Sequence, residues 1–233
     1  MIGLSHEGLI AWSGPLLAGA AVTVEMTFAA YAIALVIGLL GAAAKLGGPS
    51  PLRALATLYT TIVRAVPELL LIILLYYAGQ QLLNNVLHSL GYSTVDFNGF
   101  ATAIGVLAAV EGAYLTEIFR GAIQAIPAGH IEAANAYGMS RGLRFRRVVL
   151  PEMLPQALPS MYNIFLLLVK DTALVSVVGF NELFFTSQQA AASTRSYFLF
   201  YTAAGVLYLL MTMGSNVVFR WLERRVTRHR PAM

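Results

Sequence analysis

The feature that most constrains this chain is a long stretch without a charged side chain. Residues 26–44, MTFAAYAIALVIGLLGAAA, are uncharged and lie between Glu25 and Lys45. About 20 predominantly apolar residues are enough for a helix to cross the hydrocarbon core of a bilayer. A backbone in that environment has to satisfy its hydrogen bonds internally, which favours a helix. The stretch therefore predicts a membrane-spanning helix, which we extend back to Leu17.

The composition of the whole chain extends this prediction to the other segments. The 233 residues are 58% hydrophobic and only 11% charged, whereas soluble domains carry about 25% charged residues. We therefore expect most of the surface to face lipid. The chain has no cysteine, and its four histidines show no ligand spacing, so we expect neither a disulfide nor a metal site. The net charge of +4 is modest, and basic residues in a membrane protein more often mark cytoplasmic loops. We therefore expect no nucleic-acid partner.

The apolar segments predict an all-α integral membrane protein with about five transmembrane helices. Pro67 predicts a kink in the second helix, which neighbouring helices in a membrane tolerate. The mixed region 171–195 is expected to form short or re-entrant helices rather than a full span. We find no internal repeat and place one domain over 19–222. The five predicted spans are 17–44, 55–83, 100–124, 152–170 and 196–220.

The basic residues predict the orientation of the chain. Of the 15 Lys and Arg, 12 fall in the first loop with its approach, in the segment before the fourth span, or in the C-terminal tail. Loops rich in Lys and Arg stay in the cytoplasm. We therefore expect the C-terminus to be cytoplasmic and the N-terminus to be outside.

The polar segment 127–150 differs from the apolar chain around it. Its IEAANAY stretch favours a helix, with Glu132 in the first turn, where a carboxylate suits the helix dipole. Gly138 is placed to end this helix in the left-handed conformation, and Ser140 can cap a second one. Pro151 suits the first turn of the fourth span. We predict a short helix across the cytoplasmic end of the bundle, turned at a glycine and followed by a basic cluster.

This segment and four others resemble a known family. The spacing of an EAA triplet, a glycine, a β-branched residue and a Leu-Pro pair resembles the EAA signature of bacterial ABC importer membrane subunits. The wider chain is similar to polar amino-acid permeases, above all the Q-type subunits of histidine/lysine/arginine/ornithine importers and their octopine and nopaline relatives. The signature residues are Glu132, Ala133, Ala134, Gly138, Val148, Leu150 and Pro151, and the other similar segments are 59–77, 112–134, 170–179 and 215–225.

The resemblance implies an ABC transporter type-1 permease fold in the bacterial inner membrane, with a cytoplasmic coupling helix. It also implies a second homologous permease, two cytoplasmic ABC ATPase subunits and a periplasmic solute-binding protein as partners, besides membrane lipid. The chain has no GxxxxGK[ST] loop, so we expect ATP to be bound by the partner ATPase and this chain to carry no cofactor and no enzymatic activity. The expected ATPase-coupling residues are Glu132, Ala133, Ala134, Gly138 and Arg141.

Ionisable residues in or beside the spans are candidates for the substrate pathway, because such groups are costly in a membrane and face protein or a watery cavity. Glu111, with Tyr114 nearby, is our candidate for contacting a cationic substrate group, and Asp171 is a further candidate. A packing role for Glu111 against the partner subunit remains equally open.

Three other charged residues predict structural contacts. Arg64 and Glu68 are at positions i and i+4 and can neutralise each other as an ion pair. Glu117 is expected to pair with Arg64 or Arg120 and to hold the bundle or a gate.

These observations together predict a permease subunit of an ATP-driven amino-acid importer that gives alternating access, with basic amino acids or opines as the expected substrates. Neutral or acidic polar amino acids are the alternative. A proton-coupled secondary transporter, with Glu111 and Glu117 as a relay, is the alternative from another class. A membrane enzyme ranks last, because the sequence shows neither metal-ligand spacing nor a serine nucleophile motif.

Overall fold

The computed structural model describes residues 6–93 and 98–227, and every regular element in these ranges is helical. Five helical segments there are long and apolar enough to cross a membrane: Gly8–Gly47, Glu68–Ser89, Gly99–Gln124, Arg141–Val178 and Tyr197–Val226. The predicted fold class, an all-α membrane protein with five spans, is confirmed. In chain order the elements are α1 (His6–Gly47), α2 (Ser50–Ala65), α3 (Glu68–Ser89), α4 (Gly99–Gln124), α5 (Ala128–Ala136), α6 (Arg141–Arg144), the π-helical turn η1 (Phe145–Val149), α7 (Leu150–Asp171), the 3₁₀ turn η2 (Thr172–Val178), α8 (Leu183–Thr194) and α9 (Tyr197–Thr227).

The centre of the bundle is the contact between α1 and α4. A Cβ atom added at Gly38 of α1 would lie 2.6 Å from the Cβ of Leu115 on α4. A Cβ atom added at Gly112 of α4 would lie 2.6 Å from the Cγ2 of Ile37 on α1. Small residues let membrane helices approach closely and gain packing energy that lipid cannot supply. These glycines therefore set the distance between the two helices.

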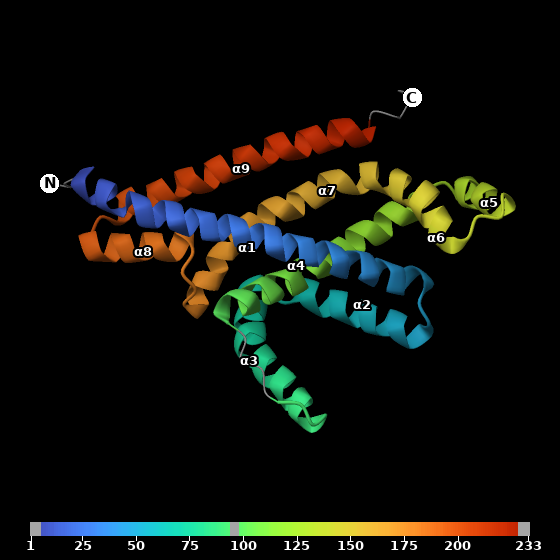
Figure 1. Ribbon diagram of the computed structural model, residues 1–233, viewed down its shortest axis with the longest axis horizontal. Coiled ribbons are helices and arrows are strands. Elements are labelled where there is room, and N and C mark those ends of the chain that lie inside the picture. Colours follow the sequence, from blue (N-terminus) through green and yellow to red (C-terminus); the bar gives the residue numbers. More distant parts are fainter. Residues whose placement is uncertain (1–5, 94–97, 228–233) are drawn as a thin grey trace.

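The prediction of one kinked span over 55–83 is wrong. The chain forms two separate helices, because Val66 is extended (φ −96°, ψ 140°) ahead of Pro67. A residue before proline is sterically driven out of the helical region, so the break follows from local chemistry. Only α3 is a candidate span, and it projects from the bundle in Figure 1. The preceding helix, α2, is a separate amphipathic element.

The other predicted spans agree with the structure in place but not always in length. The predictions 100–124 and 152–170 agree with α4 and α7 to within two residues at each end. α1 begins earlier and α9 ends later than predicted, because a helix can continue into polar flanks beyond the membrane core. The short helices expected over 171–195 are confirmed as η2 and α8. The domain bounds 19–222 stay a prediction.

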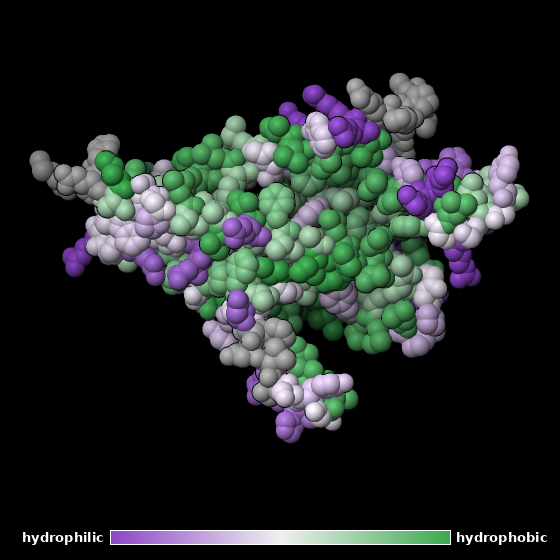
Figure 2. Space-filling model, in the orientation of Figure 1, coloured by the Kyte–Doolittle hydropathy of each residue, from purple (hydrophilic) through white to green (hydrophobic). Residues whose placement is uncertain are grey.

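The two ends of the bundle differ in charge. The start of α1 and α8 lie at one end, whereas the α1–α2 turn, α5, α6 and the C-terminal end of α9 lie at the other (Figure 1). Figure 2 shows apolar surface over the middle of the bundle and hydrophilic side chains around α5 and α6. Three basic groups that are far apart in the sequence therefore gather at one end, here called the basic end.

Candidate functional site

The segment predicted to couple the permease to an ATPase protrudes at the basic end. Gly138 has a φ of +71° and ends α5 through a left-handed turn. The Ser140 hydroxyl accepts a hydrogen bond from the Leu143 N–H at 3.4 Å and caps α6, and Pro151 lies in the first turn of α7. The predicted helix, glycine turn and capped second helix are confirmed. The π-helical turn η1 between α6 and α7 was not predicted.

One face of α5 is held by the bundle, and the other is free in this chain. Ala134 is buried, and Ile131 packs against the main apolar core. Tyr137, at the end of α5, is 85% exposed, which is unusual for a large aromatic side chain. The predicted coupling residues other than Ala134 are all exposed: Glu132, Ala133, Gly138 and Arg141. The segment thus presents a mixed polar and aromatic surface, and Ala134 anchors it.

Two side-chain contacts join α5 to the elements that follow it. The Arg144 guanidinium donates a hydrogen bond to the Asn135 side-chain oxygen, which links α6 to α5. His130 Nδ1 lies 2.8 Å from Glu152 Oε2 in the first turn of α7. His130 and Glu152 are 22 residues apart, so no local pattern signals their contact. A force on α5 therefore reaches α7 through side chains as well as through the backbone.

The candidate substrate residues Glu111 and Asp171 come together inside the bundle. Their carboxyl groups, on α4 and at the end of α7, interact directly. Glu111 is only 1% exposed, and one carboxyl oxygen of each residue is buried without a hydrogen-bond partner among the described residues. Two adjacent carboxyl groups in an apolar span repel each other unless they share a proton or hold a cation. The pair can therefore either share a proton or hold a positively charged group.

Tyr114 and Glu68 extend this acidic group. The Tyr114 hydroxyl donates a hydrogen bond to Glu68 Oε1 at 3.1 Å, and Glu68 acts electrostatically on both Glu111 and Asp171. The predicted ion pair between Arg64 and Glu68 is not formed in the described part of the chain. Its absence follows from the break at Pro67, because the helical spacing assumed for the pair does not exist. Glu68 thus belongs to the candidate substrate group, an assignment that the sequence did not suggest.

A second polar cluster lies towards the basic end. Glu117 forms an ion pair with Arg120, one of its two predicted partners. The Arg120 Nη2 atom lies 2.8 Å from Glu117 Oε2. Its other cationic partner is Lys45, which also donates to the Thr60 hydroxyl at 2.6 Å. Arg64, the alternative partner, is exposed and does not contact it. The cluster ties the end of α1 to α2 and α4, which supports a structural role.

Glu182 is a buried carboxyl group that the sequence analysis did not single out. It lies outside the membrane-spanning segments and caps α8, accepting hydrogen bonds from the N–H groups of Phe184 at 2.9 Å and Phe185 at 2.7 Å. It also accepts from the hydroxyls of Tyr208 at 2.9 Å and Thr23 at 3.3 Å. Burial raises the pKa of Glu182, and the hydrogen bonds to its carboxylate oppose that rise. Glu182 thereby joins α1, α8 and α9.

The described residues contain no group of three or more His, Cys, Asp or Glu side chains arranged to hold a metal ion. Five apolar helices, an exposed helix at the basic end and a carboxyl pair within the bundle describe a helical membrane protein with ionisable groups in its interior. A family comparison defines the class further. The chain belongs to the family described as binding-protein-dependent transport system inner membrane component, whose profile matches residues 34–228.

Relatives with high sequence similarity to this chain are permease subunits of ABC importers. The chain is 42% identical over 217 residues to the histidine/lysine/arginine/ornithine transport system permease protein HisQ of Escherichia coli (strain K12), covering 93% of this chain and 95% of HisQ. It is 42% identical over 231 residues to the octopine transport system permease protein OccQ of Agrobacterium tumefaciens (strain Ach5), covering 98% of this chain and 95% of OccQ. A crystal structure of an amino acid ABC transporter with histidines is similar at 28% identity and a TM-score of 0.78, covering 95% of this chain and 99% of that one.

These comparisons confirm the resemblance and the transport function. The chain is an inner-membrane permease component of an ABC importer, a transporter rather than an enzyme, and its family works with an ATPase and a substrate-binding protein. The membership also decides against the proton-coupled secondary transporter.

Proposed function

We propose that this chain is the permease subunit through which a cationic amino acid or opine crosses the inner membrane by alternating access. The observation that carries this proposal is the buried pair of Glu111 and Asp171, with Glu68 and Tyr114 beside it. When they are ionised, carboxylates in an apolar surrounding stabilise a cation because water does not screen their charge. The names of HisQ and OccQ, which refer to basic amino acids and to octopine, support the same substrate class.

In the proposed assembly, the chain pairs with a second homologous permease. Two ATPase subunits bind the cytoplasmic face of this pair, and a solute-binding protein binds its periplasmic face. ATP is bound by the ATPases, and this chain holds no cofactor. The exposed surface of α5 and α6 is the docking site, with Glu132 and Arg141 offering charges to the ATPase and Gly138 allowing close approach. Closure of the ATPases then moves α7 through α5 and α6.

The proposed orientation puts the basic end in the cytoplasm and the start of α1 outside. Because the chain contains no cysteine, single introduced cysteines can report it. Ser193→Cys at the end of α8 should react with a membrane-impermeant maleimide in spheroplasts. Tyr137→Cys should react only after the membrane is permeabilised. The reverse pattern would overturn the orientation.

Coupling is tested at Gly138. A valine there is strained because the backbone φ is +71°, although nothing lies within 4 Å of its Cβ. In the complete transporter reconstituted in proteoliposomes, Gly138→Val should lower transport per ATP hydrolysed while the chain remains in the membrane. The matched control is Gly205→Val in α9, which lies outside the docking surface, also has open space around its Cβ and lacks a positive φ. An unchanged ratio in the Gly138 variant would contradict the coupling role.

The substrate class is tested at Glu111. Removing one charged hydrogen-bonding partner of a ligand costs about 1.5–3 kcal/mol, which is at least about tenfold in transport at limiting substrate. Glu111→Gln should therefore weaken uptake of arginine or octopine by tenfold or more and affect glutamine much less. The control is Glu25→Gln, at an exposed carboxylate on α1. Equal losses for charged and neutral substrates would point to a packing role for Glu111. If the wild-type transporter took up neutral or acidic amino acids faster than arginine or octopine, that result would favour the alternative substrate class.

A further inference from the structure

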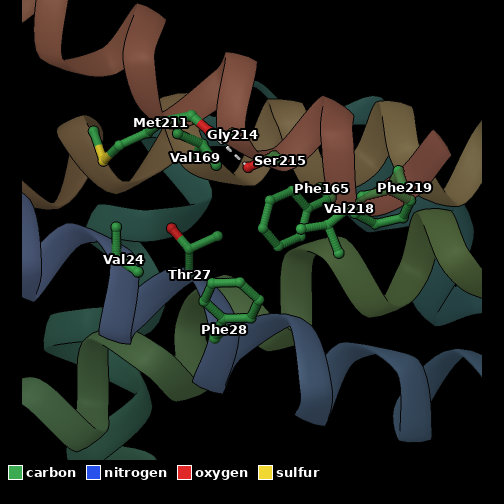
Figure 3. A pocket seen from close by; sticks show the side chains of 10 residues that line it. All are labelled: Val24, Thr27, Phe28, Phe165, Val169, Met211, Gly214, Ser215, Val218 and Phe219. Atoms are coloured by element: carbon green, nitrogen blue, oxygen red, sulfur yellow. Dashed lines mark hydrogen bonds between the residues drawn. The ribbon is translucent and has the colours of Figure 1, made fainter. Parts of the chain in front are cut away.

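An apolar cavity lies on the side of the bundle formed by α1, α7 and α9. Its volume is about 220 Å³, larger than the roughly 150 Å³ of engineered cavities that bind benzene. Figure 3 shows side chains of all three helices around it. The lining residues are Val24, Thr27, Phe28, Phe165, Val169, Met211, Gly214, Ser215, Val218 and Phe219.

The wall of this cavity offers no free polar group to a ligand. The Thr27 hydroxyl donates to the Thr23 carbonyl at 2.8 Å, and the Ser215 hydroxyl donates to the Met211 carbonyl at 2.8 Å. Both lining hydroxyls are therefore satisfied within their own helices. Such a cavity does not hold ordered water, which needs two to four polar partners. Its occupant has to be apolar.

The cavity is open on the outer surface at membrane depth. Phe28 is 58% exposed and Val218 is 51% exposed, although both line the cavity. Gly214 contributes no side chain, and nothing lies within 4 Å of a Cβ atom added there. This differs from the glycines between α1 and α4, whose space is filled by neighbouring side chains. The opening is thus a slot beside α9 that lipid chains can enter.

The slot has a polar end next to the basic end of the bundle. A second cavity of about 130 Å³ shares Phe219 with the first and is lined by Asn216 and Arg220. Glu223 also lines it. The Arg220 guanidinium has neither an ion pair nor a hydrogen bond within the described residues. Basic side chains outnumber acidic ones in the last two turns of α9, where Arg224 and Arg225 accompany Arg220 and Glu223.

The length of the slot corresponds to one leaflet of a bilayer. Met211 and Arg220 are nine residues apart, which is about 14 Å along a helix, and half of the hydrocarbon core is about 15 Å. Beyond Arg220, the guanidinium carbon of Arg225 lies 4.1 Å from the centre of the Trp221 ring. Tryptophan and arginine together are typical of the headgroup level. Arg220 therefore lies where a lipid phosphate would be.

We propose that this slot binds one anionic phospholipid, with an acyl chain between α1, α7 and α9 and the phosphate at Arg220. The proposal depends on the orientation given above only in naming the leaflet, which is the cytoplasmic one. A neutral zwitterionic lipid satisfies the apolar slot equally well but gains less from the unpaired arginine. The charge of Arg220 therefore accounts for the preference for an anionic headgroup.

The test is native mass spectrometry of the complete transporter, delipidated in detergent and titrated with dioleoyl-phosphatidylglycerol or dioleoyl-phosphatidylcholine. The wild type should bind one phosphatidylglycerol per copy of this chain more tightly than phosphatidylcholine. Arg220→Gln should weaken phosphatidylglycerol binding about fivefold, equivalent to about 1 kcal/mol, and leave phosphatidylcholine binding unchanged. Arg224→Gln, on the same helix but outside the slot, is the matched control. Equal binding of the two lipids, or equal effects of the two arginine variants, would overturn the headgroup assignment.

Filling the slot provides an independent arm. Gly214→Phe should abolish tight binding of both lipids, and Gly205→Phe, at an exposed glycine earlier in α9 whose Cβ also meets nothing, should not. Ser215→Leu gives a smaller filling side chain in case Gly214→Phe prevents assembly. Retained lipid binding in an assembled slot-filled variant would refute the proposal. So would cross-linking of Val218→Cys to the second permease, because that result would show a protein subunit covering the slot.

Discussion

Replacing Glu182 by alanine should loosen the end of the bundle where α1, α8 and α9 meet. Loss of the cap on α8 costs about 0.5–2 kcal/mol, and the buried Tyr208 hydroxyl would lose its acceptor at about 1–3 kcal/mol. Removing a buried carboxylate returns part of its desolvation cost. We therefore expect a net destabilisation of about 2–3 kcal/mol. For a chain of this size, that lowers the Tm by about 4–12 °C.

Trp12 provides a local readout of this change. It packs edge-on against Phe200, with ring centres 6.5 Å apart, in the apolar cluster that joins the same three helices. The sequence has two tryptophans, so the purified chain carrying Trp221→Phe reports thermal unfolding from Trp12 alone. Glu25→Ala, at an exposed carboxylate, is the control and should change the free energy of unfolding by no more than about 0.5 kcal/mol. An equal Tm for the Glu182 and Glu25 variants would refute the reasoning.

The pH dependence separates the charge of Glu182 from its shape. Because burial raises the folded-state pKa of Glu182, the folded chain holds this proton more tightly than the unfolded chain. Its stabilising contribution is present in full below the unfolded pKa of about 4.3 and is lost as the pH rises through the raised folded pKa. Glu182→Gln keeps hydrogen-bonding groups but cannot ionise. The difference in Tm between Glu182→Gln and wild type should therefore grow in favour of the variant as the pH rises through this window.

Three further predictions concern other contacts. Gly38→Val should destabilise the chain by about 1–3 kcal/mol through overpacking against α4, where an added Cβ has a neighbour at 2.6 Å, while Gly105→Val, with open space, should not lower the Tm through overpacking. Lys45→Met should cost about 1–3 kcal/mol by removing a partner of Glu117, and a double-mutant cycle with Glu117→Gln measured by Tm should show coupling between the two positions. His130→Ala should lower transport per ATP hydrolysed in proteoliposomes without lowering the Tm, since the His130 side chain is 56% exposed; an equal ratio would contradict the role of its contact in transmission.

Local chemistry accounts for most of the structure of the polar segment 127–150. Gly138 and Ser140 act within a few residues of themselves, so their turn and cap could be predicted from spacing alone. The break at Pro67 is also local, but the sequence predicts a kink there rather than the end of a helix. That error carried over to Arg64 and Glu68, because their expected contact depended on one continuous helix.

The sequence by itself determined that the chain lies in a membrane, how many apolar helices it forms and where the exposed helix α5 ends in a glycine turn. These properties follow from the burial of apolar residues, from backbone hydrogen bonds and from residues close together in the chain. Only the tertiary structure decided that Glu111 meets Asp171, that Lys45 replaces Arg64 as a partner of Glu117, and that Glu182 joins three helices. Such contacts depend on how the helices pack against one another, through small residues such as Gly38 and Gly112, and hydropathy patterns carry no record of that geometry.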